Sequence, residues 1–239
     1  MNAPAPAPGT PRFAGNRVYW GPGFVDLASG SYQLLEDAVP EAVPDGGDFP
    51  NDYAWSPGGE RLLACFSSGT RLYDGRTGAC VATIATEPGL APQGAWSGER
   101  AAVLATGNPR VVDVSGRLIA DIPLHGGVIA AIAADDAERR LIIVDVNRAV
   151  AWIDTSTWTV LDLWPGPWMH GALSPDGRLV AALAHDGIIH FAHLDGDRFA
   201  PAGQVHAHPS TIAITLCRDE IVTVGGGELR RAMFLNLSS

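Results

Sequence analysis

Histidine is the residue type in this chain with the clearest potential for metal or acid–base chemistry, because six of its seven copies fall between His170 and His208. They include the pairs His190-x-x-His193 and His206-x-His208. A metal site needs ligand atoms that converge to about 2.1 Å from the ion. Positions 190 and 193 point to opposite faces of a strand, so this pair cannot chelate one ion directly. The other pair can share a face, but two ligands alone define no site.

Serine and glycine patterns give no sign of catalysis either. Ser56, Ser97 and Ser174 occupy the same place in an internal repeat, which predicts a role in turns, because a catalytic residue would occur once. No Gly-x-Ser-x-Gly elbow is present. The run Gly225-Gly226-Gly227 precedes neither a helix nor a Lys-Ser/Thr pair, as a phosphate loop would. We therefore predict no catalytic residue, no cofactor and no metal, and we interpret His170 as a hydrogen-bonding cap at a strand entrance.

The repeat itself is a short phrase that occurs six times. Its acidic or amide residue recurs at spacings of 48, 39, 41, 41 and 41 residues, at Asp26, Asp74, Asp113, Asp154, Asp195 and Asn236. A period near 40 built from short apolar runs and tight turns is typical of a β-propeller with one blade per repeat. We expect these recurring residues to cap turns.

The fifth repeat shows how each blade is built. Strands are predicted at residues 171–174, 179–184, 188–194 and 198–205, and are called a to d from the inside outward. The sequences between them, Pro-Asp-Gly, His-Asp-Gly and Asp-Gly-Asp, favour turns because Gly adopts positive φ and Asp bonds the local backbone. Strand a carries small residues in five repeats, as the crowded axis of a propeller requires: Ala54, Ala95, Ala131, Ala172 and Ala213.

Three features are similar to a known family: the segment SPDGRLVAAL at residues 174–183, the strand-c aspartates, and a His before strand a in three repeats. On these residues the chain resembles the WD-repeat and bacterial YVTN-type propellers. The resemblance covers residues 17–237, although no repeat contains a Trp-Asp dipeptide. It implies that the d–a and b–c connections emerge on one face and the a–b and c–d turns on the other.

The predicted fold is therefore all-β, a six-unit β-propeller with incomplete first and last blades. Residues 1–15 are expected to be a disordered Pro/Ala-rich lead-in, and residues 16–239 a single propeller domain. The first unit begins at strand b (residues 17–20), and the last ends at Asn236 without strand d. We expect residues around 10–15, or a strand from a partner, to cover the resulting gap.

Charge and composition narrow the class of partner. The net charge is −10, which argues against nucleic acid and anionic membranes. No stretch approaches the roughly 20 apolar residues of a membrane span. The first 15 residues lack the apolar run of a secretory signal, and three cysteines, an odd number, argue against a disulfide framework. These features predict a cytoplasmic protein with three buried, reduced cysteines.

Two segments depart from the repeat and are the candidates for binding. The first is the loop of residues 36–52, whose acidic residues include Glu36, Asp37, Glu41, Asp45 and Asp48. It is either a contact for a basic partner or a solvated loop. The second is residues 163–171, where Trp164 and Trp168 flank a Pro-Gly-Pro turn. An exposed Trp on a rigid loop is typical of binding hot spots, whereas rings that cover a blade interface would be structural.

These features favour a non-enzymatic scaffold that binds a protein partner with a basic element through the d–a/b–c face. Besides the acidic loop, that face would gather Trp164, Trp168, His170, His185 and Asp186, with Trp168 as the anchor. Two alternatives stay open: a structural subunit of a larger assembly, and an enzyme or metal-binding propeller with a site at the mouth of the axial channel.

Overall fold

A computed structural model shows an all-β chain, without a helix in the part of the sequence that it describes. That part comprises residues 12–14, 17–20, 22–34, 50–66, 68–85, 93–105, 108–124, 129–134, 139–146, 148–208, 211–216, 220–225 and 228–233. Within these ranges there is no helix of the length and apolarity needed to cross a membrane. The chain divides into two compact units, residues 1–121 and 122–239.

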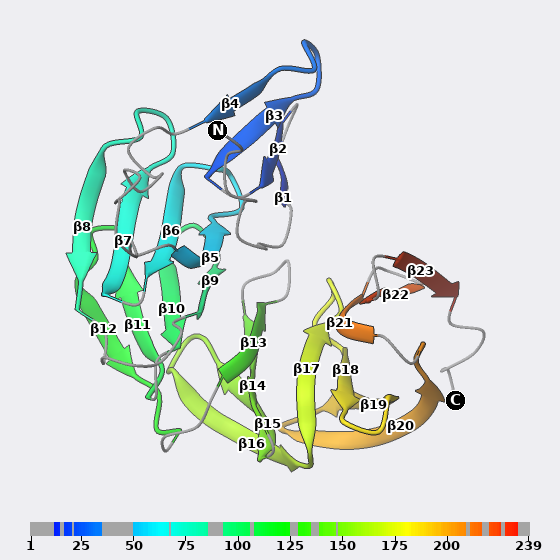
Figure 1. The fold of residues 1–239 in the computed structure, drawn as a ribbon. Helices are drawn as coiled ribbons and strands as arrows, with labels where there is room; N and C mark the ends of the chain where they lie inside the picture. The colour runs from blue at the N-terminus through cyan, green and yellow to red at the C-terminus, as the bar shows by residue number, and fades with distance from the viewer. Residues whose placement is uncertain are drawn as a thin grey trace. The chain divides into compact units, whose positions relative to one another are not determined.

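Unit 1 holds three antiparallel sheets of four strands, and the strands of each sheet are neighbours in chain order (Figure 1). The first sheet is β1 (Arg12–Ala14), β2 (Arg17–Trp20), β3 (Gly23–Asp26) and β4 (Tyr32–Leu34). The second is β5 (Pro50–Trp55), β6 (Arg61–Phe66), β7 (Gly69–Asp74) and β8 (Cys80–Ile84). The third is β9 (Gln93–Ser97), β10 (Ala101–Ala105), β11 (Arg110–Asp113) and β12 (Leu118–Asp121).

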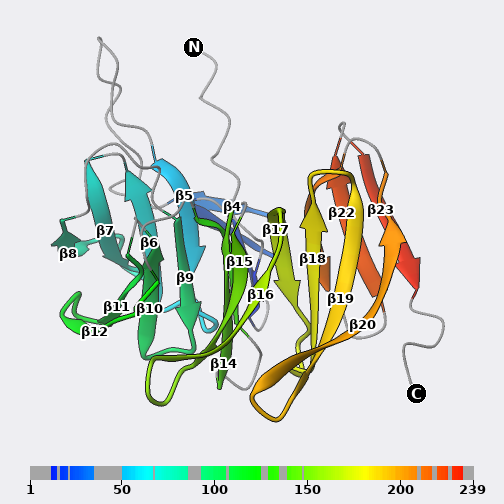
Figure 2. The same ribbon diagram turned by 90° about the horizontal axis from the view of Figure 1, so that it is seen from below.

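Unit 2 repeats the plan, and Figure 2 shows the strands of its middle sheet side by side. Its first sheet is β13 (Ile129–Ala134), β14 (Arg140–Asp145), β15 (Ala149–Asp154) and β16 (Thr159–Pro165). The middle sheet is β17 (Trp168–Leu173), β18 (Leu179–Ala184), β19 (Ile188–Asp195) and β20 (Arg198–His206). The last has three strands among the described residues, β21 (Thr211–Leu216), β22 (Glu220–Gly225) and β23 (Glu228–Met233).

Six small antiparallel sheets are compatible with the predicted propeller. The three-stranded last sheet agrees with the expected absence of strand d, within the described residues. The first sheet corrects the prediction, because Arg12–Ala14 form β1 and pair with β2, Arg12 opposite Tyr19. The lead-in assigned to residues 1–15 is wrong at these positions. The overlooked signal is the Gly15-Asn16 dipeptide between the two strands, a hairpin-type sequence. Residues 1–11 and 234–239 lie outside the described part.

The second strand of each repeat forms the core. In β6, β14 and β18 the first residue is half-buried and the next five are buried. Neighbouring sheets of the same unit cover both faces of β6 and of β18. First strands contact one another from sheet to sheet: β5 lies against β9, β13 against β17 and β17 against β21. The predicted small residues all lie on these first strands, where backbones approach closely.

A β-bulge interrupts the fourth strand at the same place in three sheets. The register shifts between Leu72 and Tyr73, between Val111 and Val112, and between Trp152 and Ile153, one or two residues before the repeated aspartate. On the opposing strands this leaves Val81, Ile119 and Leu161 as the extra, unpaired residues. A bulge re-aims the side chain of the extra residue and disturbs the edge for further pairing.

Candidate interaction surfaces

The d–a and b–c connections of unit 2 meet at one end of its middle sheet, as the resemblance implies. Trp168 pairs with Ala184, and Ile188 pairs with His206. These pairings place the start of β17, the turn containing His185 and Asp186, and the end of β20 together. The acidic residues of the other predicted segment, Glu36, Asp37, Glu41, Asp45 and Asp48, lie outside the described residues.

Trp168 corrects the prediction of an exposed anchor. It is the first residue of β17 and only 3% exposed. Its Nε1–H donates a hydrogen bond to the Trp164 carbonyl over 2.8 Å, and its ring centroid lies 4.7 Å from that of Trp164 and 5.3 Å from that of His190. A Cβ at Gly166 would collide with the Trp168 ring. The Trp168 ring therefore packs in the interface between two sheets beside the Pro-Gly-Pro turn. This is the structural role that the sequence left open as the alternative to a binding hot spot.

The other predicted residues of this end differ in burial. Trp164 is partly buried in the same cluster, with its ring 5.7 Å from that of Phe199. His185 and Asp186 are exposed. The Asp186 carboxylate accepts a hydrogen bond from the backbone N–H of Ile188 over 3.0 Å, as a turn residue does. Their part in binding stays a prediction.

His170 forms a hydrogen bond as predicted, but it lies inside β17 and bonds to the next sheet, so it does not cap the entrance of its own strand. Its Nδ1 accepts the backbone N–H of Ile214 over 3.4 Å and so joins β17 to β21, the first strand of the next sheet. Burial lowers the pKa of His170 to about 4, because the charged imidazolium loses its hydration. The side chain is consequently neutral at physiological pH and acts as an acceptor.

Asp52 is the third residue of β5, as His170 is of β17, and its structural role was not predicted from the sequence. One of its carboxylate oxygens accepts the backbone N–H of Gly94, in the first strand of the next sheet, over 3.2 Å, and the other accepts that of Tyr53 over 2.9 Å. Burial raises the pKa of Asp52 to about 7, against the effect of these hydrogen bonds. Asp52 precedes Ser56 by four residues, as His170 precedes Ser174, and this spacing could have identified it.

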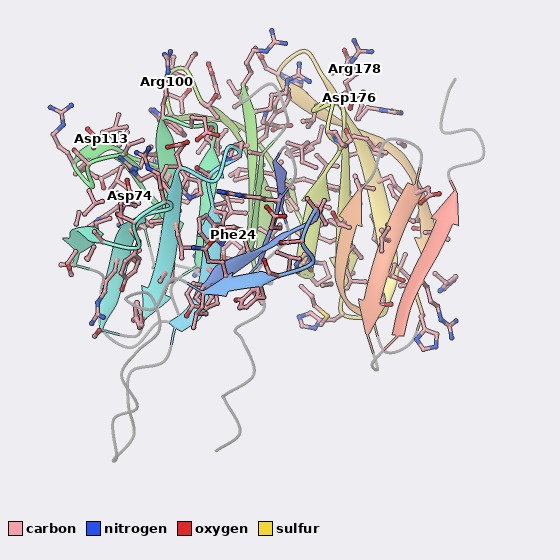
Figure 3. All side chains as sticks on the ribbon, turned by 90° about the horizontal axis from the view of Figure 1, so that it is seen from above. Phe24, Asp74, Arg100, Asp113, Asp176 and Arg178 are labelled. Atoms are coloured by element: carbon pink, nitrogen blue, oxygen red, sulfur yellow. The ribbon has the colours of Figure 1, made fainter. Side chains whose placement is uncertain are left out.

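Four repeated aspartates have the predicted role as turn caps. The carboxylates accept backbone N–H groups two or more residues ahead, and Figure 3 labels two of them, Asp74 and Asp113. These hydrogen bonds lower the pKa of Asp26, Asp74, Asp113 and Asp154. For Asp113 the largest cause is the bond from the Ser115 hydroxyl, and its pKa falls to about 2. Structural hydrogen bonds thus engage these four carboxylates.

The repeated serines are structural too. Ser56 and Ser174 are buried, and their hydroxyl oxygens accept backbone N–H groups across the a–b turns, from Arg61 and from Leu179. In the latter turn, Ser174 also donates to Asp176, which Figure 3 labels beside Arg178. Of the cysteines, Cys65 on β6 is buried as predicted, but Cys80 is exposed at the start of the outer strand β8. Cys217 lies outside the described residues.

Exposed apolar side chains are concentrated in unit 1. Large hydrophobic residues that are at least a third exposed there lie on or beside the outer strands: Leu27, Tyr32, Leu34, Val81, Val114, Leu118 and Ile119. The described residues of unit 2 contribute Leu163 and Val205. The bulge residues show the contrast most directly, since Val81 and Ile119 are 43% and 46% exposed, whereas Leu161 packs against the core of unit 2.

Comparison with protein-family models and with curated proteins gives no match to this chain. Membership of a propeller family consequently stays an expectation. In the described residues, no group of three or more His, Cys, Asp or Glu side chains is arranged to hold a metal ion.

Proposed function

We propose that this protein is a non-enzymatic β-propeller scaffold that binds a protein partner. The observation that carries the proposal is the exposed apolar surface on the outer strands of unit 1, where β12 presents Leu118 and Ile119 at 51% and 46% exposure. Exposed large apolar side chains that gather on one strand are typical of interaction sites. We expect this partner to carry a basic element, because the net charge of the chain is −10.

The bulge supports a functional origin for this exposure. The same bulge in the outer strand of unit 2 carries Leu161, which is partly buried against the core. The repeat can thus accommodate an apolar bulge residue without exposing it. In unit 1 the chain retains Val and Ile at exposed bulge positions, where a polar residue would be compatible with the fold.

The test is a pair of matched double variants. Leu118→Glu/Ile119→Glu adds two charges to the outer strand of unit 1, and Leu163→Glu/Val205→Glu does so at exposed sites of unit 2. Wild-type protein would be used to isolate a stoichiometric partner from the native host, and the affinity of the purified partner for each variant would then be measured. We expect the first variant to lose at least roughly tenfold in affinity, the second to retain it, and both to keep the wild-type Tm. Equal affinity for the two variants would refute this surface.

A structural subunit is the second candidate, favoured by β23. This strand pairs with β22 over six residues without a register shift, and no strand pairs with its other edge among the described residues. An open, regular edge can accept a strand from another chain. A partner that binds the Leu118→Glu/Ile119→Glu variant normally, and slows hydrogen exchange of the β23 amides, would favour this role over the first.

A further inference from the structure

The turns between the third and fourth strands share one backbone plan. In the first two sheets a glycine lies four residues after the repeated aspartate: Gly30 after Asp26 and Gly78 after Asp74. Both glycines have left-handed backbones, with φ of 66° and 77°, and donate their N–H to the aspartate carbonyl over 2.8 and 2.9 Å. This geometry favours glycine, because a Cβ crowds the backbone at positive φ.

Trp158 occupies this position in the turn between β15 and β16. It follows Asp154 by four residues, has φ of 57°, and donates its N–H to the Asp154 carbonyl over 2.7 Å. It is the one non-glycine residue with positive φ in the described part of the chain. A bulky residue in this region is strained, and the other turns show that glycine satisfies the same geometry. The backbone plan therefore does not require a tryptophan here.

Trp158 is not part of the apolar core cluster described for this region. The apolar cluster of this region includes Trp152 and Trp168, with Trp164 and Phe199 packed against it, and Trp158 lies outside that cluster. Its side chain is partly buried, while Ser156, Thr157 and Thr159 around it are exposed. The ring thus sits on a turn at the surface, at the end of the β13–β16 sheet opposite to Trp164.

The turn holds Trp158 on a rigid base. One Asp154 carboxylate oxygen accepts hydrogen bonds from the N–H and the hydroxyl of Ser156, both over 2.8 Å, and the other accepts the Thr157 hydroxyl over 3.1 Å. The hydroxyls of Thr157 and Thr159 lie 2.7 Å apart. A side chain on a fixed backbone loses less conformational entropy on binding than one on a loose loop.

We propose that Trp158 is an anchor that inserts into an apolar pocket of a protein partner. Trp is enriched among residues that dominate binding energy, and backbone strain is concentrated at functional sites. We expect hydrogen-bonding groups at the rim of this pocket, because Ser156, Thr157 and Thr159 beside the ring are exposed and carry hydroxyl groups. This inference rests on the proposed scaffold function and adds a surface at the c–d turns of unit 2, separate from the outer strands of unit 1.

The first test is thermal unfolding of Trp158→Gly beside Gly78→Ala. The glycine variant relieves the left-handed strain, so its Tm should equal or exceed that of wild type. The alanine variant creates the same strain in an equivalent turn and should lower Tm by about 2–4 °C. A Tm of Trp158→Gly below the wild-type value would show that packing retains the ring, and would overturn the proposal.

The second test identifies the contact. The photo-reactive residue p-benzoylphenylalanine would replace Trp158 and, as a control, Leu163, and cells of the native host would be irradiated. We expect one discrete adduct from position 158 and none from position 163. The purified adduct partner should then bind Trp158→Gly at least roughly tenfold more weakly than wild type. No adduct at 158, or unchanged affinity, would overturn the inference.

The two proposals fail separately. If Trp158→Gly weakens binding and Leu118→Glu/Ile119→Glu does not, the scaffold function stands and its surface in unit 1 is wrong. If the reverse holds, the surface in unit 1 stands and Trp158 has no role in it. A protein that yields no partner in either experiment contradicts the scaffold function itself.

Discussion

Asp52 in unit 1 and His170 in unit 2 perform one structural task with opposite chemistry. Each lies on a first strand and accepts a backbone N–H from the first strand of the next sheet, Asp52 over 3.2 Å and His170 over 3.4 Å. Burial raises the pKa of the acid to about 7 and lowers that of the base to about 4. In both cases desolvation favours the neutral form. The position requires a buried acceptor, which an acid and an imidazole can each provide.

The two residues respond to pH in opposite directions. The pKa of Asp52 is higher in the folded state than its ordinary value of 3.8, so its contribution to stability is complete below pH 4 and is lost as pH rises through 7. The pKa of His170 is lower than its ordinary value of 6.5, so its contribution is present above that pH and is lost as pH falls through 4. Lowering the pH from 7 to 4 therefore stabilises the contact between sheets that Asp52 makes and destabilises the one that His170 makes.

The largest effect is expected from Asp52→Asn. The amide retains an oxygen that can accept the Gly94 N–H and does not titrate. Relative to wild type, the variant should gain about 4 kcal/mol in free energy of unfolding between pH 4 and pH 8, since one pKa unit corresponds to about 1.4 kcal/mol. Denaturant unfolding of both proteins at several pH values measures this difference. A difference that does not change with pH would mean that Asp52 has an ordinary pKa.

His170→Gln should show the opposite trend and a somewhat smaller effect. Wild type should lose about 3 kcal/mol relative to this variant as pH falls from 7 to 4, because only the imidazole becomes protonated. The exposed His206, replaced in His206→Gln, is the control. The same series of denaturant titrations applies. If the control variant shows an equal trend, burial of His170 is not the cause.

Trp96→Phe tests a second hydrogen bond between β5 and β9, which has no counterpart between β17 and β21 among the described hydrogen bonds. Trp96 is buried, and its Nε1–H donates to the Ala54 carbonyl over 2.9 Å, whereas the corresponding residue of β21 is Leu216. The change removes this hydrogen bond and part of a buried ring, which together should cost about 2 kcal/mol. Leu216→Met, a change of similar volume, should cost less than about 1.5 kcal/mol. Equal losses in the two variants would contradict a specific role for the indole N–H.

The smallest effect concerns the serines of the a–b turns. The Ser174 hydroxyl oxygen accepts hydrogen bonds from the backbone N–H groups of Arg178 and Leu179. The Ser56 hydroxyl oxygen accepts one from the backbone N–H of Arg61. Ser174→Ala should therefore cost about 1 kcal/mol, and Ser56→Ala less. Their Tm values, measured side by side, would settle the order, and a larger loss for Ser56→Ala would contradict it.

Local signals predicted the strands well and the environment of side chains poorly. The glycine and aspartate turns define β18 at residues 179–184, as predicted, and β19 extends only one residue further than expected. Such turns depend on residues close in sequence. The burial of Trp168 depends on which neighbouring sheet its strand faces, and the role of Asp52 depends on a strand 42 positions away. A pattern within one repeat, taken alone, does not contain that information.

Some features could have been predicted by aligning the repeats more strictly. Asp52 and His170 share a spacing to the turn serine, and Trp158 stands where two other turns have glycine. The three-residue strand Arg12–Ala14 is too short for periodicity to reveal, so only the Gly-Asn dipeptide that follows it in the sequence signalled it. The outward direction of Val81 and Ile119 comes from bulges, which change the alternation on which sequence patterns rely.

Strand length differs between the sheets, and we expect the rates of amide hydrogen exchange to differ with it. The strands of the first sheet have three or four residues, and those of the β17–β20 sheet have six to nine. Short ladders open with little loss of contact, so their amides exchange with solvent early, while long ladders stay closed until larger openings occur. In heavy water, the amides between β2 and β3 should become deuterated long before those between β18 and β19. We therefore expect local unfolding to begin in the N-terminal sheet.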